Sequence, residues 1–97
     1  MRFDEKDSKD PRIKRTYDLY LFEEGTVPQA PNVNGVYILY DDVANVVYIG
    51  SARQGEMQDR LREKLKDGAC SKAKFRQIFE TKTLEDARQI EKEWVKK

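Results

Sequence analysis

The sequence predicts a small α+β domain of β-β-α-β-α order, in which a three-stranded, mainly antiparallel sheet is flanked by helices. Two runs rich in β-branched and aromatic residues, 36–40 and 46–49, are separated by a short polar segment, as in a β-hairpin. Apolar residues recur at helical spacing over 56–67 and again after Thr83. With 97 residues, 38 % apolar and 38 % charged, the chain allows one domain with a lean core.

The part of the chain before the hairpin is expected to lie largely outside this core. Residues 1–15 are dense in charge and nearly devoid of apolar side chains, which predicts a mobile arm. Residues 16–22 are more apolar and are expected to add a short strand or to pack across the domain. We therefore expect a charged N-terminal arm with a possible extra strand over 1–27, and the domain proper over 28–97.

The elements after the hairpin are predicted from apolar spacing and capping residues. The first helix, 56–67, repeats an apolar residue every fourth position, and Gly68 is expected to end it with a positive φ. Residues 75–80 favour a third strand over an extension of a helix. Thr83 is a good N-cap for the last helix, and the acidic residues that follow it in the first turn are favoured by the helix dipole. The repeated apolar residues of the first helix are Met57, Leu61 and Leu65.

Two absences exclude several classes of chemistry. The chain has no histidine and only one cysteine, Cys70, which excludes zinc sites built from Cys and His, catalytic triads that need an imidazole, and a disulfide within the chain. No apolar run approaches the roughly 20 residues of a membrane span, and the charged start does not resemble a signal peptide. We expect a soluble, intracellular (cytoplasmic) protein without a membrane partner, whose chemistry comes from Tyr, Arg, Lys, Asp, Glu, Ser or Thr.

The last predicted helix carries a carboxylate on its apolar side. At about 100° per residue, its apolar residues fall within one arc of roughly 140°, and Glu91 falls within the same arc. A charge there is costly unless it is compensated. Glu91 therefore either reaches the edge of the face or pairs with a buried arginine, or it serves as a metal ligand or catalytic acid in a cleft. The apolar residues of this arc are Leu84, Ala87, Ile90, Trp94 and Val95.

Two further pairs of residues flank the predicted core. Arg60 and Lys64 lie side by side on the first helix, where they form either a solvated face or a phosphate site. Each residue of one hairpin strand faces a residue of the other. If the two residue numbers of such a facing pair add up to an odd number, Tyr37 and Tyr48 share one face of the sheet, and if the sum is even they lie on opposite faces. The sequence leaves this register open, and ordinary packing is the commoner role of such tyrosines.

These residues together resemble the GIY-YIG nuclease superfamily, in particular the nuclease domain of its excision-repair members and small stand-alone GIY-YIG domains. The paired signature is matched by Gly35-Val36-Tyr37 and, after ten residues, Tyr48-Ile49-Gly50. The resemblance covers about residues 28–97 in the family's β-β-α-β-α order. Further matches are the short basic stretch Ser51-Ala52-Arg53, the arginine helix at Asp59-Arg60-Leu61, and the glutamate helix around Glu91.

The resemblance implies a divalent-metal-dependent endonuclease that hydrolyses DNA phosphodiester bonds and is structure-selective or directed by a partner. It implies that Glu91 holds one Mg²⁺ or Mn²⁺ and that Arg60 binds the scissile phosphate. Tyr37 and Tyr48 would orient or deprotonate the attacking water, and a base role requires nearby cations that favour the phenolate. The alternative is a catalytically weak or inactive module of the same fold that binds nucleic acid or a protein partner.

Three other positions bear on this expectation. Gly35 and Gly50 would let the backbone approach the site closely. Lys64 stands one turn after the expected phosphate-binding arginine, where the family usually has His or Tyr, and a protonated lysine is a poor base. The sequence shows no counterpart of the asparagine that many members carry beyond the glutamate helix.

The formal net charge of +1 hides an uneven distribution. Residues 1–52 hold six basic and nine acidic residues, whereas residues 53–97 hold thirteen basic and nine acidic residues. The basic excess lies over 53–82, which points to the side that meets a phosphate backbone, although each lysine alone fits an ordinary charged surface. DNA is the expected partner, together with a protein partner or a second copy of the chain. The expected DNA-binding residues are Ser51, Arg53, Lys64, Lys72, Lys74 and Arg76.

Overall fold

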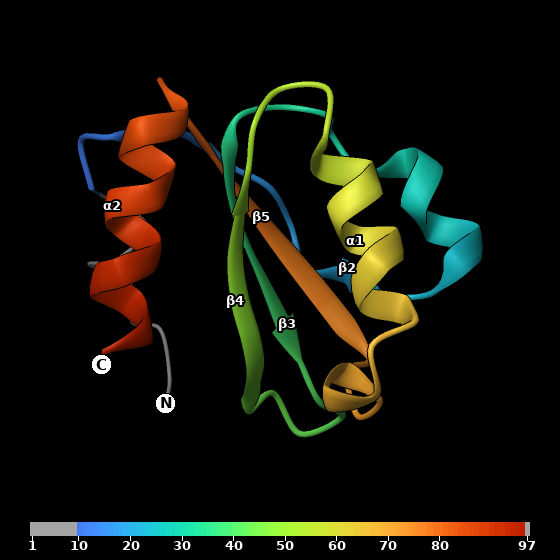
Figure 1. Ribbon diagram of the computed structural model, residues 1–97. Coiled ribbons are helices and arrows are strands. Elements are labelled where there is room, and N and C mark those ends of the chain that lie inside the picture. Colours follow the sequence, from blue (N-terminus) through green and yellow to red (C-terminus); the bar gives the residue numbers. More distant parts are fainter. Residues whose placement is uncertain (1–9, 97) are drawn as a thin grey trace.

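The computed structural model describes residues 10–96, which fold into three layers (Figure 1). Helix α2 covers one face of an antiparallel sheet, and α1 covers the other together with the 3-10 helix η2. The elements follow in the order β1 (Ile13–Thr16), β2 (Tyr20–Leu21), η2 (Glu24–Gln29), β3 (Gly35–Tyr40), β4 (Val46–Ala52), α1 (Met57–Leu65), η3 (Gly68–Cys70), β5 (Phe75–Thr81) and α2 (Leu84–Val95).

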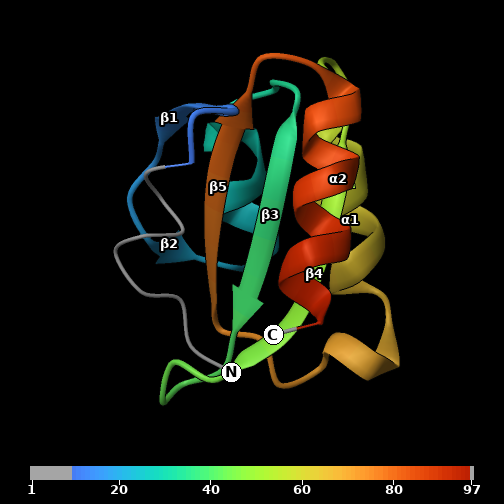
Figure 2. The ribbon, with the colours of Figure 1, turned by 90° about the vertical axis from the view of Figure 1, so that its left-hand side faces the viewer.

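The described sheet has five strands, so the expectation of three strands is wrong. Its order is β1-β5-β3-β4, and β2 also pairs with β5 (Figure 2). Strand β1 pairs with the end of β5 near Thr81, and β2 pairs with its beginning at Phe75 and Arg76. The outer edge of β5 would otherwise leave its backbone N–H and C=O groups unpaired, and the two short strands cover it. Strand β4 forms the other edge of the sheet.

Most of the predicted elements are confirmed. The hairpin, the third strand and both helices lie where the patterns place them, and the Thr83 hydroxyl caps α2 by accepting a hydrogen bond from the Asp86 backbone N–H at 3.1 Å. Two details are wrong. Gly68 has no positive φ and instead begins η3, which is capped by the Asp67 side chain. Val95 is 55 % exposed and does not belong to the core.

The core consists of two clusters, one on each face of the sheet. Strand β3 is buried along its whole length, and its residues alternate between the clusters. The cluster under α1 and η2 is formed by Phe22, Val27, Ala30, Tyr37, Leu39, Ala52, Met57, Leu61, Cys70, Ala73 and Ile78. The cluster under α2 is formed by Val36, Ile38, Tyr40, Ile49, Phe79, Ala87, Ile90 and Trp94.

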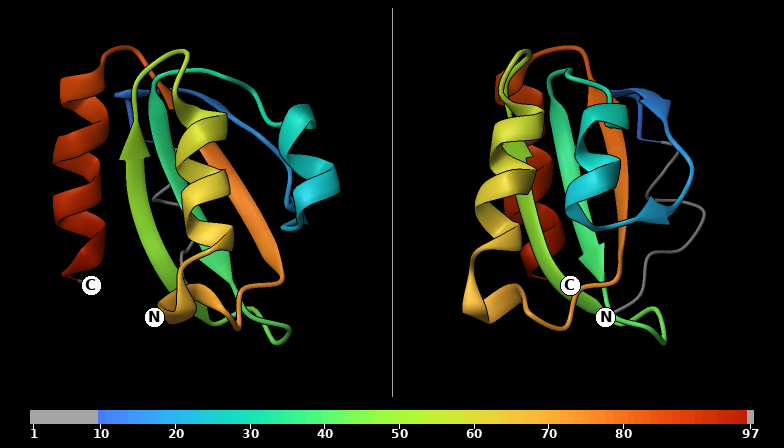
Figure 3. Two further views of the ribbon diagram at one scale, coloured as in Figure 1. Left: turned by 45° about the vertical axis from the view of Figure 1, so that its right-hand side comes forward. Right: turned by 90° about the vertical axis from the view of Figure 1, so that its right-hand side faces the viewer.

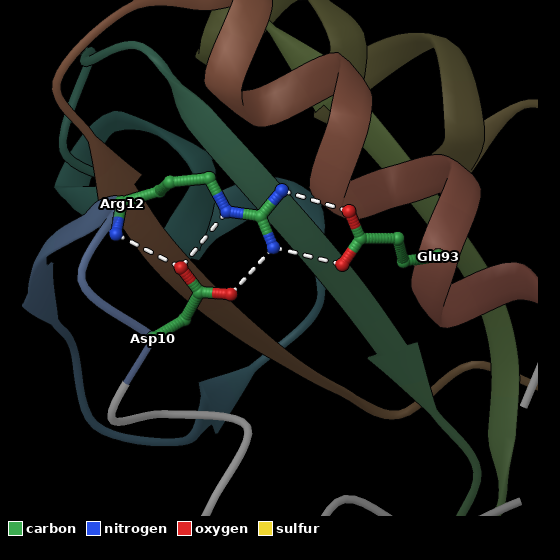
Figure 4. A network of polar contacts seen from close by, with 3 residues as sticks. All are labelled: Asp10, Arg12 and Glu93. Carbon is green, nitrogen blue, oxygen red and sulfur yellow. Dashed lines mark hydrogen bonds and ion pairs between the residues drawn. The ribbon is translucent and has the colours of Figure 1, made fainter.

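The start of the described chain is fastened to α2, so the prediction of a mobile arm is wrong for residues 10–15. Arg12 lies between two carboxylates (Figure 4). Its Nε donates to Asp10 Oδ1 at 2.9 Å, and its two terminal nitrogens donate to the two carboxylate oxygens of Glu93 at 2.8 Å. The rest of the predicted arm, residues 1–9, lies outside the described residues.

We expect Arg12→Gln to lower the free energy of unfolding by about 1 kcal/mol near neutral pH, because the replaced ion pairs are bidentate but partly exposed. Hydrogen bonds from Arg12 lower the pKa values of Asp10 and Glu93 from their ordinary values of 3.8 and 4.5. Lowered pKa values stabilise the folded state above the unfolded values, and the stabilisation is lost as the carboxylates protonate. The difference between variant and wild type should therefore shrink below about pH 4.

Urea unfolding at several pH values measures this difference. The control is Arg62→Gln, which removes an arginine on α1 whose nearest carboxylate, Asp59, lies at 3.5 Å. Its effect is expected to stay below about 0.5 kcal/mol at every pH. Equal effects of the two variants would show that the Arg12 ion pairs contribute nothing beyond an ordinary surface contact.

Candidate functional site at the edge of the sheet

The strand register places both candidate tyrosines on the same face of the sheet. Tyr37 on β3 lies opposite Gly50 on β4, and Leu39 lies opposite Tyr48. Both phenols therefore face α1, as an odd register requires. Their ring centroids are 6.0 Å apart with an angle of 29° between the planes, so the two rings stack.

Gly50 makes room for the phenol of Tyr37. A Cβ atom at position 50 would lie only 2.4 Å from Tyr37 Oη, so no other residue fits there without displacing that ring. Tyr37 is 2 % exposed, and burial raises its pKa strongly, with further contributions from Tyr48 and Glu91. The phenol is therefore protonated at neutral pH, which suits a hydrogen-bond donor rather than a general base.

Glu91 lies on α2 at the margin of its buried face and is partly buried. Its carboxylate Oε1 accepts a hydrogen bond of 2.6 Å from the Ser51 hydroxyl of β4. Ser51 points toward α2 because side chains alternate along a strand, whereas the face at its neighbour Gly50 is filled by the Tyr37 phenol. The serine thus compensates the carboxylate that the helical pattern marks as unusual, and it fixes the orientation of that carboxylate.

The four residues predicted to be catalytic come together. One hollow of about 230 Å³ is lined by all four: Tyr37 from β3, Tyr48 from β4, Arg60 from α1 and Glu91 from α2. We call this the β4-edge hollow, because it lies where α1 and α2 approach the edge strand from opposite faces. Its other lining residues are Gly50, Ser51, Glu63 and Lys64.

Two cations line the α1 side of the β4-edge hollow. Arg60 Nη1 lies 3.1 Å from Glu63 Oε2, and Lys64 Nζ lies 4.4 Å from the ring centroid of Tyr48 and 3.6 Å from Asp67 Oδ2. Burial alone would lower the pKa of Lys64, but its contacts with the Tyr48 phenol and Asp67 outweigh burial and raise it. Lys64 is therefore a cation that attracts phosphate or a phenolate, and not a proton acceptor.

The donor set of the β4-edge hollow fits a weakly bound Mg²⁺ or Mn²⁺. Glu91 offers one carboxylate held in place by Ser51, whereas Glu63 is occupied by Arg60. Within residues 10–96 no three Asp, Glu, His or Cys side chains gather in a group that holds a metal ion. Mg²⁺ commonly takes one or two carboxylates and completes its shell with waters and substrate phosphate oxygens. Such an ion binds tightly only together with a phosphate substrate.

The expected DNA-binding residues fall into three groups: residues that line a hollow, exposed lysines outside the hollows, and one buried arginine. Ser51 and Lys64 line the β4-edge hollow, and Arg53 lines a neighbouring one. Lys72 and Lys74 are exposed in the connection between η3 and β5, away from both hollows.

The DNA-binding expectation is wrong for Arg76, which is 3 % exposed. Its Nη1 donates to the carbonyl oxygen of Thr26 at 3.0 Å, and its guanidinium lies over the Tyr20 ring. Burial lowers the pKa of this guanidinium. Arg76 thus fastens η2 and β2 to β5 and exposes almost no surface to a DNA backbone.

Two residues near the site, Glu63 and Arg88, are not among the residues predicted from the sequence. Glu63 pairs with the candidate phosphate-binding arginine three residues earlier, a spacing that predicts contact on a helix. Arg88 lines the neighbouring hollow together with Arg53 and Arg60. It precedes Glu91 by three residues on α2, and the same helical spacing is the signal that places both on one side of that helix.

Comparison with known proteins gives one match. Residues 19–97 match the profile of a protein family described as a domain of unknown function, DUF7508. No curated protein and no solved structure matches the chain. Within the described residues, no helix has the length and apolar character needed to cross a membrane. The family description assigns no activity, so the residues of the β4-edge hollow are the basis for assigning one.

Proposed function

The chain belongs to the DUF7508 family of domains of unknown function, and we propose that it acts as a divalent-metal-dependent endonuclease on DNA phosphodiester bonds. The observation that carries this proposal is the convergence of Tyr37, Tyr48, Arg60 and Glu91, from four separate elements, on one hollow. The resemblance of the sequence to GIY-YIG nucleases supports the same assignment.

Phosphate binding is the first task of the proposed site. Arg60 and Lys64 are one helical turn apart and line the same side of the hollow, so both reach one phosphodiester group. The guanidinium offers five N–H donors, of which the ion pair with Glu63 uses only part. The arginine would bind two phosphate oxygens and neutralise the charge that builds up in the transition state.

The two tyrosines take different roles. Tyr37 is buried and protonated, so it would donate a hydrogen bond to the attacking water or to a phosphate oxygen. Tyr48 is only partly buried, and the Lys64 ammonium lies next to its ring. Tyr48 is thus the more accessible of the two phenols, and we therefore assign to it the acceptance of the proton from the attacking water.

Glu91 would hold the divalent ion, which when bound supplies stabilisation of the leaving 3′ oxygen and of the phosphate charge. The Ser51 hydroxyl occupies one carboxylate oxygen of Glu91 and thereby orients the other. A single carboxylate of this kind predicts weak metal binding by the free protein and stronger binding in the presence of DNA.

A second candidate is a DNA-binding module of this fold without catalysis. The observation that favours it is Lys64, which lines the hollow as a cation, so that it can bind a phosphate but cannot accept a proton from water. The two candidates make the same electrostatic contacts with DNA and differ in whether a bond is broken.

A cleavage assay decides between them. We expect the protein to cut labelled branched, nicked or single-stranded DNA in the presence of Mg²⁺ or Mn²⁺. We expect cutting to stop in EDTA and to return when the metal is restored in excess. Salt-sensitive DNA binding without cutting of any of these substrates, with either metal, would contradict the nuclease and support the binding module.

A further inference from the structure

A second hollow of about 260 Å³ adjoins the β4-edge hollow. Ser51 and Arg60 line both, so the two hollows meet at these residues. Residues from β4, α1 and α2 line the two hollows, and Figure 3 shows β4 at the edge of the sheet between these two helices. The remaining lining residues are Ala52, Arg53, Glu56, Leu84 and Arg88.

Three guanidinium groups from three parts of the chain border this second hollow. Arg53 follows β4, Arg60 lies on α1, and Arg88 lies on α2. Arg53 is paired with Glu56 at 3.3 Å, and Arg60 is paired with Glu63 at 3.1 Å outside this hollow. Among residues 10–96, Arg88 forms no ion pair with a carboxylate within 4.0 Å, so its charge is not compensated by a described residue.

Like charges gathered around a concavity repel one another, and an anion bound in the concavity offsets this repulsion. Arginine is the residue best suited to phosphate, because its planar group binds two oxygens at once. The single carboxylate that lines the second hollow, Glu56, is already engaged with Arg53, which leaves a positive surplus. The hollow therefore has the charge and the donors of a phosphate site.

We propose that the second hollow binds the phosphate next to the scissile one on the same nucleic-acid strand. This inference rests on the proposed function of the β4-edge hollow. Arg60 lies between the two phosphates, and the strand runs along the edge of the sheet from Lys64 to Arg88. Two adjacent phosphate sites select a polynucleotide, so a lone phosphodiester between two small groups is a poor substrate.

Binding of a fluorescent single strand of about twelve nucleotides, followed by anisotropy without metal at several salt concentrations, tests the second hollow. We expect Arg88→Gln to weaken binding roughly 5- to 10-fold and to reduce the salt slope by about 0.7, the value for one lost phosphate contact on a single strand. Arg88→Lys keeps the charge and should retain the slope. The control is Arg15→Gln on β1 at the far edge of the sheet, which should change neither value.

Two results would overturn the second phosphate site: an Arg88→Gln variant that binds like Arg15→Gln, or a wild-type protein that does not bind the strand. The assay needs neither metal nor catalysis, so it separates this inference from the proposed function. A slope that falls as expected in a protein that cuts no DNA supports the phosphate site and contradicts the nuclease. Cutting that persists unchanged in Arg88→Gln, with an unchanged slope, contradicts the phosphate site alone.

Discussion

Replacing Glu91 by glutamine is expected to lower the rate of DNA cutting by roughly 10²- to 10⁴-fold while leaving the fold intact. Glutamine has the size of glutamate, and its amide oxygen still accepts the hydrogen bond that the Ser51 hydroxyl donates at 2.6 Å in the wild type. Only the negative charge is lost, and with it the ligand that would hold the metal ion. Single-turnover cleavage measures the rate, and urea unfolding should show a change below about 0.5 kcal/mol.

The neighbouring acid on the same helix provides a matched control. Glu93 pairs with Arg12 on the opposite side of α2, so Glu93→Gln should cost some stability and leave cutting unchanged. Ser51→Ala should lie between the two, with a loss of roughly 10-fold or more, because it frees the carboxylate to rotate. Equal cutting by the Glu91→Gln and Glu93→Gln variants would remove Glu91 from the mechanism.

The features that the sequence predicts correctly are determined by neighbouring residues. The hairpin over β3 and β4 depends on two β-rich runs and the polar turn between them, and the start of α2 depends on a threonine cap. Glu91 is recognisable because one carboxylate interrupts an apolar helical face. These patterns are complete within a few turns of chain, so the sequence alone is enough to find them.

The features that the sequence does not determine depend on long-range contacts. The pairing of Tyr37 with Gly50 is one register among several that the hairpin allows, and it is the one that buries side chains in the clusters on both faces of the sheet. Strand β1 is short and polar, and it forms because β5 offers an unpaired edge and Arg12 reaches α2. Arg76 is buried because Thr26, which is distant in sequence, accepts its hydrogen bonds. No local charge count separates such an arginine from a surface one.

Alanine at the two signature glycines is expected to destabilise the fold to different degrees. At Gly35 the added Cβ would lie 2.3 Å from the carbonyl oxygen of Phe79, in the backbone of the paired strand β5. Backbone in the middle of a sheet cannot withdraw, and we expect Gly35→Ala to lower the free energy of unfolding by about 3 kcal/mol. At Gly50 the obstacle is the ring of Tyr37, a side chain, and we expect a loss of about 1–2 kcal/mol.

The control for both is Gly68→Ala, where the added Cβ meets nothing within 4 Å and φ is not positive. Its effect on urea unfolding is expected to lie within about 0.5 kcal/mol of zero. If Gly50→Ala unfolds at the same urea concentration as Gly68→Ala, the ring of Tyr37 is not held in place as the structure has it.

Gly50→Ala also separates the fold from the site. The Tyr37 ring is enclosed by the core and stacked on Tyr48, so the ring either stays and strains the protein or moves and leaves the β4-edge hollow. In both cases the rate of DNA cutting should fall by more than the smaller fraction of folded protein explains. Combining Gly50→Ala with Tyr37→Leu removes the colliding atoms, and in a double-mutant cycle the alanine should then cost less stability than it does alone. A cost that is unchanged in the Tyr37→Leu background would mean that the glycine is required for another reason than the phenol opposite it.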